Sequence, residues 1–187
     1  QFGGFGKGFK QRVFDLRENR PQNPLYPYTA GTFGSGANMA FRASALRVIG
    51  GFDPALGPGT AAMGGEELAA FFAIVTRGYR LVYQPSAIVH HSHHRDYAKL
   101  QKQVYSYGIG LTAYLTKTLI DRPGRLLGFA ARVPLGIGYV LSSRSPKNAK
   151  KQADYPGELT WIERRGMLAG PWAYLHGRWR SRRMKQP

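Results

Sequence analysis

The 187-residue chain contains no cysteine and carries 27 Lys and Arg against 10 Asp and Glu, a formal charge of +17 at pH 7. This length suffices for one domain with a sizeable core. The absence of thiols excludes a disulfide framework and thiolate metal sites, so a metal ion would need histidine or carboxylate ligands, and it fits a reducing compartment. A surface this basic attracts polyanions, such as nucleic acid, nucleotide phosphates or an anionic membrane leaflet.

The positive charge is concentrated in the second half of the chain. Up to Arg95 there are ten Lys and Arg against five Asp and Glu, whereas from Asp96 onward there are seventeen against five. We therefore expect an ordinary globular part over residues 1–120 and a basic, mainly helical extension over residues 121–187. The glycine-rich start at Gln1, without Met or an apolar signal stretch, predicts a piece of a longer protein.

The first third is predicted to alternate loops with short elements. Residues 1–34 are rich in Gly, Pro and aromatics, as in an irregular loop region. Ser35 to Arg42 reads as a short strand. Ala43 to Ile49 reads as a short helix that ends at Gly50 and Gly51. A second glycine-rich loop covers Phe52 to Gly65.

A helix that begins with two acidic residues should follow. From Glu66 to Gly78 the sequence EELAAFFAIVTRG contains strong helix formers and ends on glycine. Tyr79 to Tyr83 and Ala87 to His91 are rich in residues that favour strands, and Pro85 separates them. We predict two short strands here, the second ending in a histidine cluster.

The remainder is predicted to be helical and associated with a surface. Tyr97 to about Ile120 has apolar residues at helical spacing. Leu126 to Leu141 is mostly apolar but falls short of the ~20 residues that span a bilayer, so we expect it to be interfacial or partly buried. Arg144 to Pro187 mixes cations with Trp and Tyr, a composition that suits a lipid headgroup layer.

Two acidic side chains form the first candidate site. Glu66 and Glu67 follow Gly64 and Gly65, so a substrate could approach the backbone closely and a carboxylate could accept a hydroxyl proton. The simpler alternative is that both carboxylates only complement the positive end of the helix dipole. That dipole lowers a carboxyl pKa, so a general base here requires burial or a bound substrate to raise it.

Histidines at the end of the second predicted strand form another candidate site, made of His90, His91, His93 and His94. Imidazole suits a divalent cation that keeps open positions for phosphate oxygens, and strand alternation puts His91 and His93 on one face. A generic metal-sticky cluster or an exposed strand end is the alternative. Arg95 could bind phosphate by bidentate hydrogen bonds or pair with Asp96.

Five blocks recur in a distinctive order over about residues 31–115: GSGANMAFR, GGFDPALGPGT, GGEEL, GYRLVYQP and AIVHHSHHR. In this order they resemble glycosyltransferase family 2. Its members commonly show a small-residue strand, a GGFDE-like loop, a GEDL helix start, a G-Y-x-hydrophobic-x-Y-x-P strand and a V-x-H-x-H-R ending. The resemblance implies the α/β, Rossmann-like GT-A fold, of which this chain would be the C-terminal, acceptor-side half.

The family resemblance also implies partners and cofactors. It implies a nucleotide-sugar donor, a glycan or lipid-linked acceptor, and Mn²⁺ or Mg²⁺ held partly by an upstream Asp-x-Asp motif. No such motif occurs in this chain, so alone it should be inactive. The implied setting is bacterial cell-wall or exopolysaccharide synthesis, in the cytoplasm and peripheral on the inner face of the plasma membrane, with an inverting transfer.

Individual residues take roles through the same resemblance. Glu67 matches the usual position of the catalytic Asp, with one extra methylene, and Glu66 matches the preceding Glu. His91 and His93 match the two family histidines and become metal-ligand candidates, with His91 preferred. The remaining matches are substrate-binding candidates, Asn38, Gly64, Gly65 and Arg95.

Asp53 in GGFDP is expected to cap a turn.

Two other function classes remain open. A basic nucleic-acid-binding module would explain the tail but not the acidic GGEEL helix, so nucleic acid is the disfavoured partner. A catalytically silent peripheral membrane protein is the other alternative.

Overall fold

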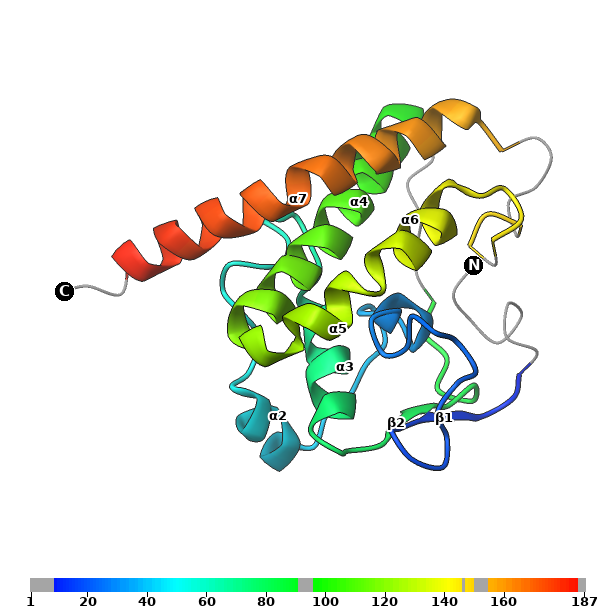
Figure 1. Ribbon diagram of the computed structural model, residues 1–187, viewed down its shortest axis with the longest axis vertical. Coiled ribbons are helices and arrows are strands. Elements are labelled where there is room, and N and C mark those ends of the chain that lie inside the picture. Colours follow the sequence, from blue (N-terminus) through cyan, green and yellow to red (C-terminus); the bar gives the residue numbers. More distant parts are fainter. Residues whose placement is uncertain (1–8, 91–95, 146, 150–154, 185–187) are drawn as a thin grey trace.

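The computed structural model describes residues 9–90, 96–145, 147–149 and 155–184 (Figure 1). The described part is mostly helical. Its elements in chain order are β1 (Arg12–Phe14), the 3-10 turn η1 (Ala30–Thr32), α2 (Ala43–Ile49), α3 (Glu66–Thr76), β2 (Leu81–Tyr83), α4 (Tyr97–Asp121), the 3-10 turn η2 (Pro123–Arg125), α5 (Leu126–Ala130), α6 (Val133–Leu141) and α7 (Gly157–Arg183).

The two longest helices, α4 and α7, lie side by side and run in the same direction (Figure 1). Residues near the start of α4 contact residues near the start of α7, and residues near the two ends also contact each other. Gln101 donates to Glu158 near the start of each helix, at 2.7 Å. Asp121 at the end of α4 pairs with Arg178, at 3.1 Å. The short helices α5 and α6 lead the chain from the end of α4 back toward the start of α7 (Figure 1).

Glycines allow the backbones of α4 and α7 to touch. A Cβ atom on Gly166 would lie 2.3 Å from the carbonyl oxygen of Tyr105, and one on Gly108 would lie 2.0 Å from that of Glu163. Both distances are far below van der Waals contact, so neither position can hold a side chain at this separation. Thr112 adds an interhelical hydrogen bond to the carbonyl oxygen of Met167, at 2.7 Å.

Helix α3 supplies the centre of the core. Its apolar residues occupy most of its circumference, and the buried ones are Ala69, Ala70, Phe71, Phe72, Ile74 and Val75. A helix that is apolar nearly all round must be enclosed on several sides. Tyr174 of α7 is 1% exposed and belongs to the same buried cluster as Phe33 and Phe72, so residues on both sides of position 120 share one core.

Several predicted elements are confirmed. The helix at Ala43–Ile49 is α2, and its C-cap Gly50 has a φ of 83°, a left-handed conformation that glycine adopts without strain. The acidic helix forms as α3 and the long amphipathic helix as α4. The predicted strand over Tyr79–Tyr83 forms as β2, restricted to Leu81–Tyr83.

The strand predicted over Ser35 to Arg42 is wrong. Only an isolated bridge joins Ser35 to Asn38, because the backbone N–H of Asn38 bonds back to the carbonyl oxygen of Ser35, at 3.2 Å. This close return makes a turn in place of an extended run. The second predicted strand is also wrong over Ala87 to His90, which has no strand structure, and His91 lies outside the described residues.

The sheet in the described part consists of β1 and β2, paired antiparallel with Val13 opposite Val82. This two-stranded pair neither supports nor contradicts the parallel sheet of a GT-A domain. The α/β fold therefore remains a prediction about a larger protein.

The apolar stretch Leu126 to Leu141 forms two short helices whose side chains are exposed or half-buried. The half-buried Phe129 packs edge-on against the ring of Tyr28, with centroids 5.3 Å apart, so the prediction of partial burial is confirmed. Within the described ranges, no helix is both long and apolar enough to cross a membrane.

The tight α4–α7 contact predicts an unusual response to alanine. Gly166→Ala should lower the free energy of unfolding by about 1–3 kcal/mol, because the helices must separate to admit the methyl group. Gly136→Ala is the matched control, since a Cβ on this helical glycine of α6 meets nothing within 4 Å. It should stabilise the protein by up to about 1 kcal/mol, as alanine favours helix. Urea denaturation of both variants measures the difference, and equal stabilities would contradict the packing.

Candidate functional site

The carboxylate pair at the start of α3 is fixed by a contact between glycine backbones. Gly65, the N-cap of α3, has a φ of 90°, and a Cβ there would lie 2.4 Å from the carbonyl oxygen of Gly110 in α4. Conformation and space therefore both require glycine at position 65. A Cβ on Gly110 would in turn lie 3.0 Å from the carbonyl carbon of Gly64. The first turn of α3, which carries Glu66 and Glu67, is thus seated directly on α4.

Each of the two glutamates packs against a glycine from a different loop. A Cβ on Gly36 would lie 3.2 Å from Cγ of Glu67, and a Cβ on Gly57 would lie 3.4 Å from Oε2 of Glu66. Both glutamates are half-buried. The loops after η1 and after α2 therefore converge on the start of α3 and form the walls around the pair.

The surroundings of Glu67 favour its protonated form. Burial raises the pKa of Glu67 above its usual value, and the negative charge of Glu66 raises it further. The backbone N–H groups of Gly65 and Glu67 oppose this shift but do not cancel it. Oε2 of Glu66 is buried and has no hydrogen-bond partner in the part of the chain that the structure describes.

Tyr107 of α4 was not identified from the sequence. Its ring is 60% exposed, and the pKa of its hydroxyl is raised by partial burial and then by the charge of Glu67. An exposed aromatic ring beside a carboxylate offers an apolar face and a proton acceptor to the same ligand. In the sequence, the only signal for this role is that Tyr107 lies three residues before Gly110. That signal can be used only once Gly110 is known to contact the start of α3.

Asn38 has a specific bond near the pair. Its side-chain amide donates to the carbonyl oxygen of Ala87, at 2.6 Å, which fastens the turn containing Gly36 to the segment after β2. Because Gly36 contacts Glu67, Asn38 supports one wall around the carboxylates. Whether Asn38 binds a substrate remains a prediction.

The other predicted site residues are placed differently. His91, His93 and Arg95 lie outside the described residues, while His90 is exposed. Across residues 9–90 and the later described ranges, no group of three or more His, Asp or Glu side chains could hold a metal ion. The Mn²⁺ or Mg²⁺ ion expected from the family resemblance stays a prediction.

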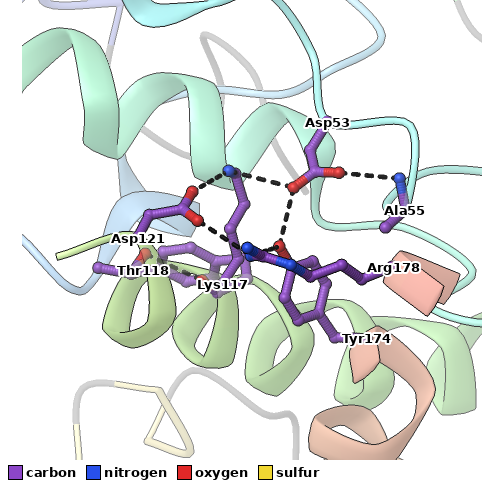
Figure 2. Close-up of polar contacts among 8 residues, drawn as sticks. Asp53, Ala55, Lys117, Thr118, Asp121, Tyr174 and Arg178 are labelled. Carbon is purple, nitrogen blue, oxygen red and sulfur yellow. Dashed lines mark hydrogen bonds and ion pairs between the residues drawn. The ribbon is translucent and has the colours of Figure 1, made fainter. Parts of the chain in front are cut away.

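A second polar cluster braces the loop after α2 (Figure 2). Asp53 accepts from the backbone N–H of Ala55 at 2.9 Å, which confirms its predicted role in a turn. Its other oxygen contacts Lys117 at 3.1 Å and accepts from the Tyr174 hydroxyl at 3.0 Å. Arg178 and Lys117 both pair with Asp121. The cluster thereby ties the loop to α4 and α7.

The Asp53 cluster has the opposite electrostatic balance from the Glu66–Glu67 pair. Burial by itself would raise the pKa of Asp53, but the Ala55 N–H and the charge of Lys117 outweigh it, so the pKa is lowered. The adjoining cleft has a volume of about 300 Å³. Of the cations that line it, Lys117 and Arg178 are paired with the two aspartates, whereas Arg182 forms no ion pair with a described residue. We interpret this cluster as structural. The turn at Asp53 and the Lys117–Asp121 spacing of four residues were the parts of it visible in the sequence.

Comparison with protein-family models, with curated proteins and with solved structures found no match for this chain. The residues themselves therefore carry any functional inference.

The raised pKa of Glu67 predicts how stability depends on pH. The folded state binds this proton more tightly than the unfolded state, so the stabilisation is complete below the ordinary carboxyl pKa and is lost as pH rises through the folded-state pKa. Glu67→Gln should remove that loss and be more stable than the wild type at neutral pH. Urea titrations from pH 4 to 8 measure it, with the exposed Glu18→Gln as control. Parallel curves for wild type and Glu67→Gln would contradict the shift.

Proposed function

We propose that this chain is the acceptor-side part of a glycosyltransferase similar to family 2, in which Glu67 is the general base. The observation that supports this most is the half-buried Glu67 carboxyl, whose pKa burial and Glu66 raise. The sequence left one objection to a base at a helix start, namely that the dipole would make it too acidic. The environment of Glu67 removes that objection, because burial and Glu66 outweigh the backbone N–H groups.

The proposed chemistry is a single displacement at the anomeric carbon of a nucleotide sugar. The acceptor oxygen forms a bond to this carbon as the bond to the leaving diphosphate oxygen breaks, and the diphosphate leaves with the electron pair. The acceptor hydroxyl proton passes to a carboxylate oxygen of Glu67. A base accepts a proton more readily as its pKa approaches the working pH, so the raised pKa serves this step. One displacement inverts the anomeric configuration.

Glu66 has a separate role in this proposal. It lies about 100° further round the helix than Glu67 and so points elsewhere, toward Gly57. Its charge raises the pKa of Glu67, and its buried Oε2, packed against Gly57, braces the loop that walls the site. Tyr107 would cover one face of the acceptor sugar.

The donor would be held by an upstream nucleotide-binding half with an Asp-x-Asp motif. There Mn²⁺ or Mg²⁺ would neutralise charge on the leaving diphosphate, and His91, His93 and Arg95 are the candidates this chain would contribute.

The direct test uses the protein that joins this chain to its donor-binding half. Glu67→Gln should lower kcat by about 10²–10⁴-fold while donor binding stays nearly unchanged, because only the proton acceptor is lost. Glu67→Asp should keep more activity, since it retains a carboxylate. Glu66→Gln should move the pH dependence of kcat to lower pH, because it removes the charge that raises the pKa of Glu67, and should lower kcat less than Glu67→Gln.

Two outcomes would contradict the assignment. A silent Glu67→Gln with an inactive Glu66→Gln would exchange the two roles. Normal kcat in both variants would place the base elsewhere. The Asp53→Asn variant serves as a control for structural damage, since it should lower stability without changing the pH profile of kcat.

A further inference from the structure

The outer face of α7 carries a row of exposed apolar side chains, which we call the α7 stripe. Its members are separated by 7, 4, 3 and 4 residues, and at about 100° per residue these steps return to one face of the helix. The first, second and third are 60%, 82% and 77% exposed. The α7 stripe consists of Trp161, Leu168, Trp172, Leu175 and Trp179.

The opposite face of α7 is the one that packs on the protein. Its buried residues are Leu159, Gly166, Gly170, Tyr174 and Gly177. Gly166 and Gly170 contact the α4 backbone, and Gly177 approaches the carbonyl oxygen of Ala55. Because the inner face is fixed in this way, the α7 stripe points away from α4.

The charges around the α7 stripe are positive. Arg165, Arg180 and Arg182 are exposed and form no ion pair with any described residue. Arg183 lies over the ring of Trp179, 3.9 Å from its centroid. The two acidic residues of α7 are engaged elsewhere: Glu163 pairs with Lys147 at 2.6 Å, and Glu158 accepts from Gln101.

We propose that α7 lies in the surface of an anionic lipid bilayer. The α7 stripe enters the boundary between headgroups and acyl chains, and the neighbouring arginines contact headgroup phosphates. Tryptophan and leucine beside arginine on one helical face are suited to this boundary. The opposite face of α7 packs on the protein through Gly166 and Gly170, so α7 would lie along the bilayer surface.

Charge favours a membrane over a second copy of the chain. Two copies meeting through the α7 stripe would bring like-charged arginine rows together, in a protein whose formal charge is already +17, whereas an anionic leaflet attracts those rows. The end of α6 lies beside α7, since Arg164 donates to the carbonyl oxygen of Leu141.

All three tryptophans of the chain lie in the α7 stripe, so intrinsic fluorescence reports on it directly. The 187-residue chain should sediment with vesicles of phosphatidylglycerol and phosphatidylcholine. Binding should rise with the phosphatidylglycerol fraction and fall at high salt. Trp emission should shift to shorter wavelength on binding, and brominated acyl chains should quench it.

Matched variants locate the surface. Leu168→Ser with Trp172→Ser should weaken vesicle binding by roughly tenfold or more, with an unchanged helical circular dichroism spectrum because neither side chain packs on the protein. Ile88→Ser, at an exposed apolar residue in the segment after β2, should bind like the wild type. Arg180→Ser with Arg182→Ser should weaken binding to anionic vesicles, and Arg42→Ser should not.

Three results would overturn the proposal. One is vesicle binding that does not respond to the Leu168→Ser and Trp172→Ser pair. Another is binding without a change in Trp emission. The third is a wild-type chain that ignores vesicles but dimerises in sedimentation equilibrium, while the paired variant stays monomeric; the α7 stripe would then be a contact between copies.

Discussion

The backbone contact between α4 and α7 is the constraint on which the rest of this structure depends. Gly108 of α4 and Gly166 and Gly170 of α7 leave no room for a Cβ atom, the nearest backbone or side-chain oxygen lying 2.0–2.3 Å from where it would be. Each helical glycine costs about 1 kcal/mol relative to alanine. That cost is offset by close contact along both helices and by the Thr112 bond to Met167.

Two surfaces follow from this one contact. On its far side, α4 presents Gly110 to Gly65, so the start of α3 and the Glu67 carboxyl are seated against a helix that α7 holds in place. On the outer side of α7, the same rotation that points its glycines inward points its tryptophans outward. The proposed catalytic carboxyl and the proposed membrane surface are therefore connected through α4. If both proposals hold, the acceptor site would sit at a fixed distance from the bilayer.

The sequence predicted local elements well and tertiary environments poorly. Helix formers and a terminal glycine located α2, and two acidic residues after glycines located α3. The strand predicted at Ser35 failed, because a hydrogen bond within a turn decided the conformation there. The candidate Glu67 was found from the order and spacing of the sequence blocks. Its raised pKa depends on burial and on the charge of Glu66, and the burial exists only in the folded chain. The Gly166 and Gly170 spacing of four was the available signal for the α7 contact.

The two carboxyl clusters differ in the direction of their pKa shifts because their neighbouring charges differ, while burial raises the pKa in both. Asp53 is surrounded by an N–H group and Lys117 and has a lowered pKa, whereas Glu67 faces Glu66 and has a raised one.

The most direct measurement of the central claim is an NMR titration of the Glu67 side-chain carboxyl carbon. We expect a midpoint above the ordinary 4.5 that moves back toward it in Glu66→Gln. A midpoint at or below 4.5, unaffected by Glu66→Gln, would contradict the assignment of Glu67 as the base.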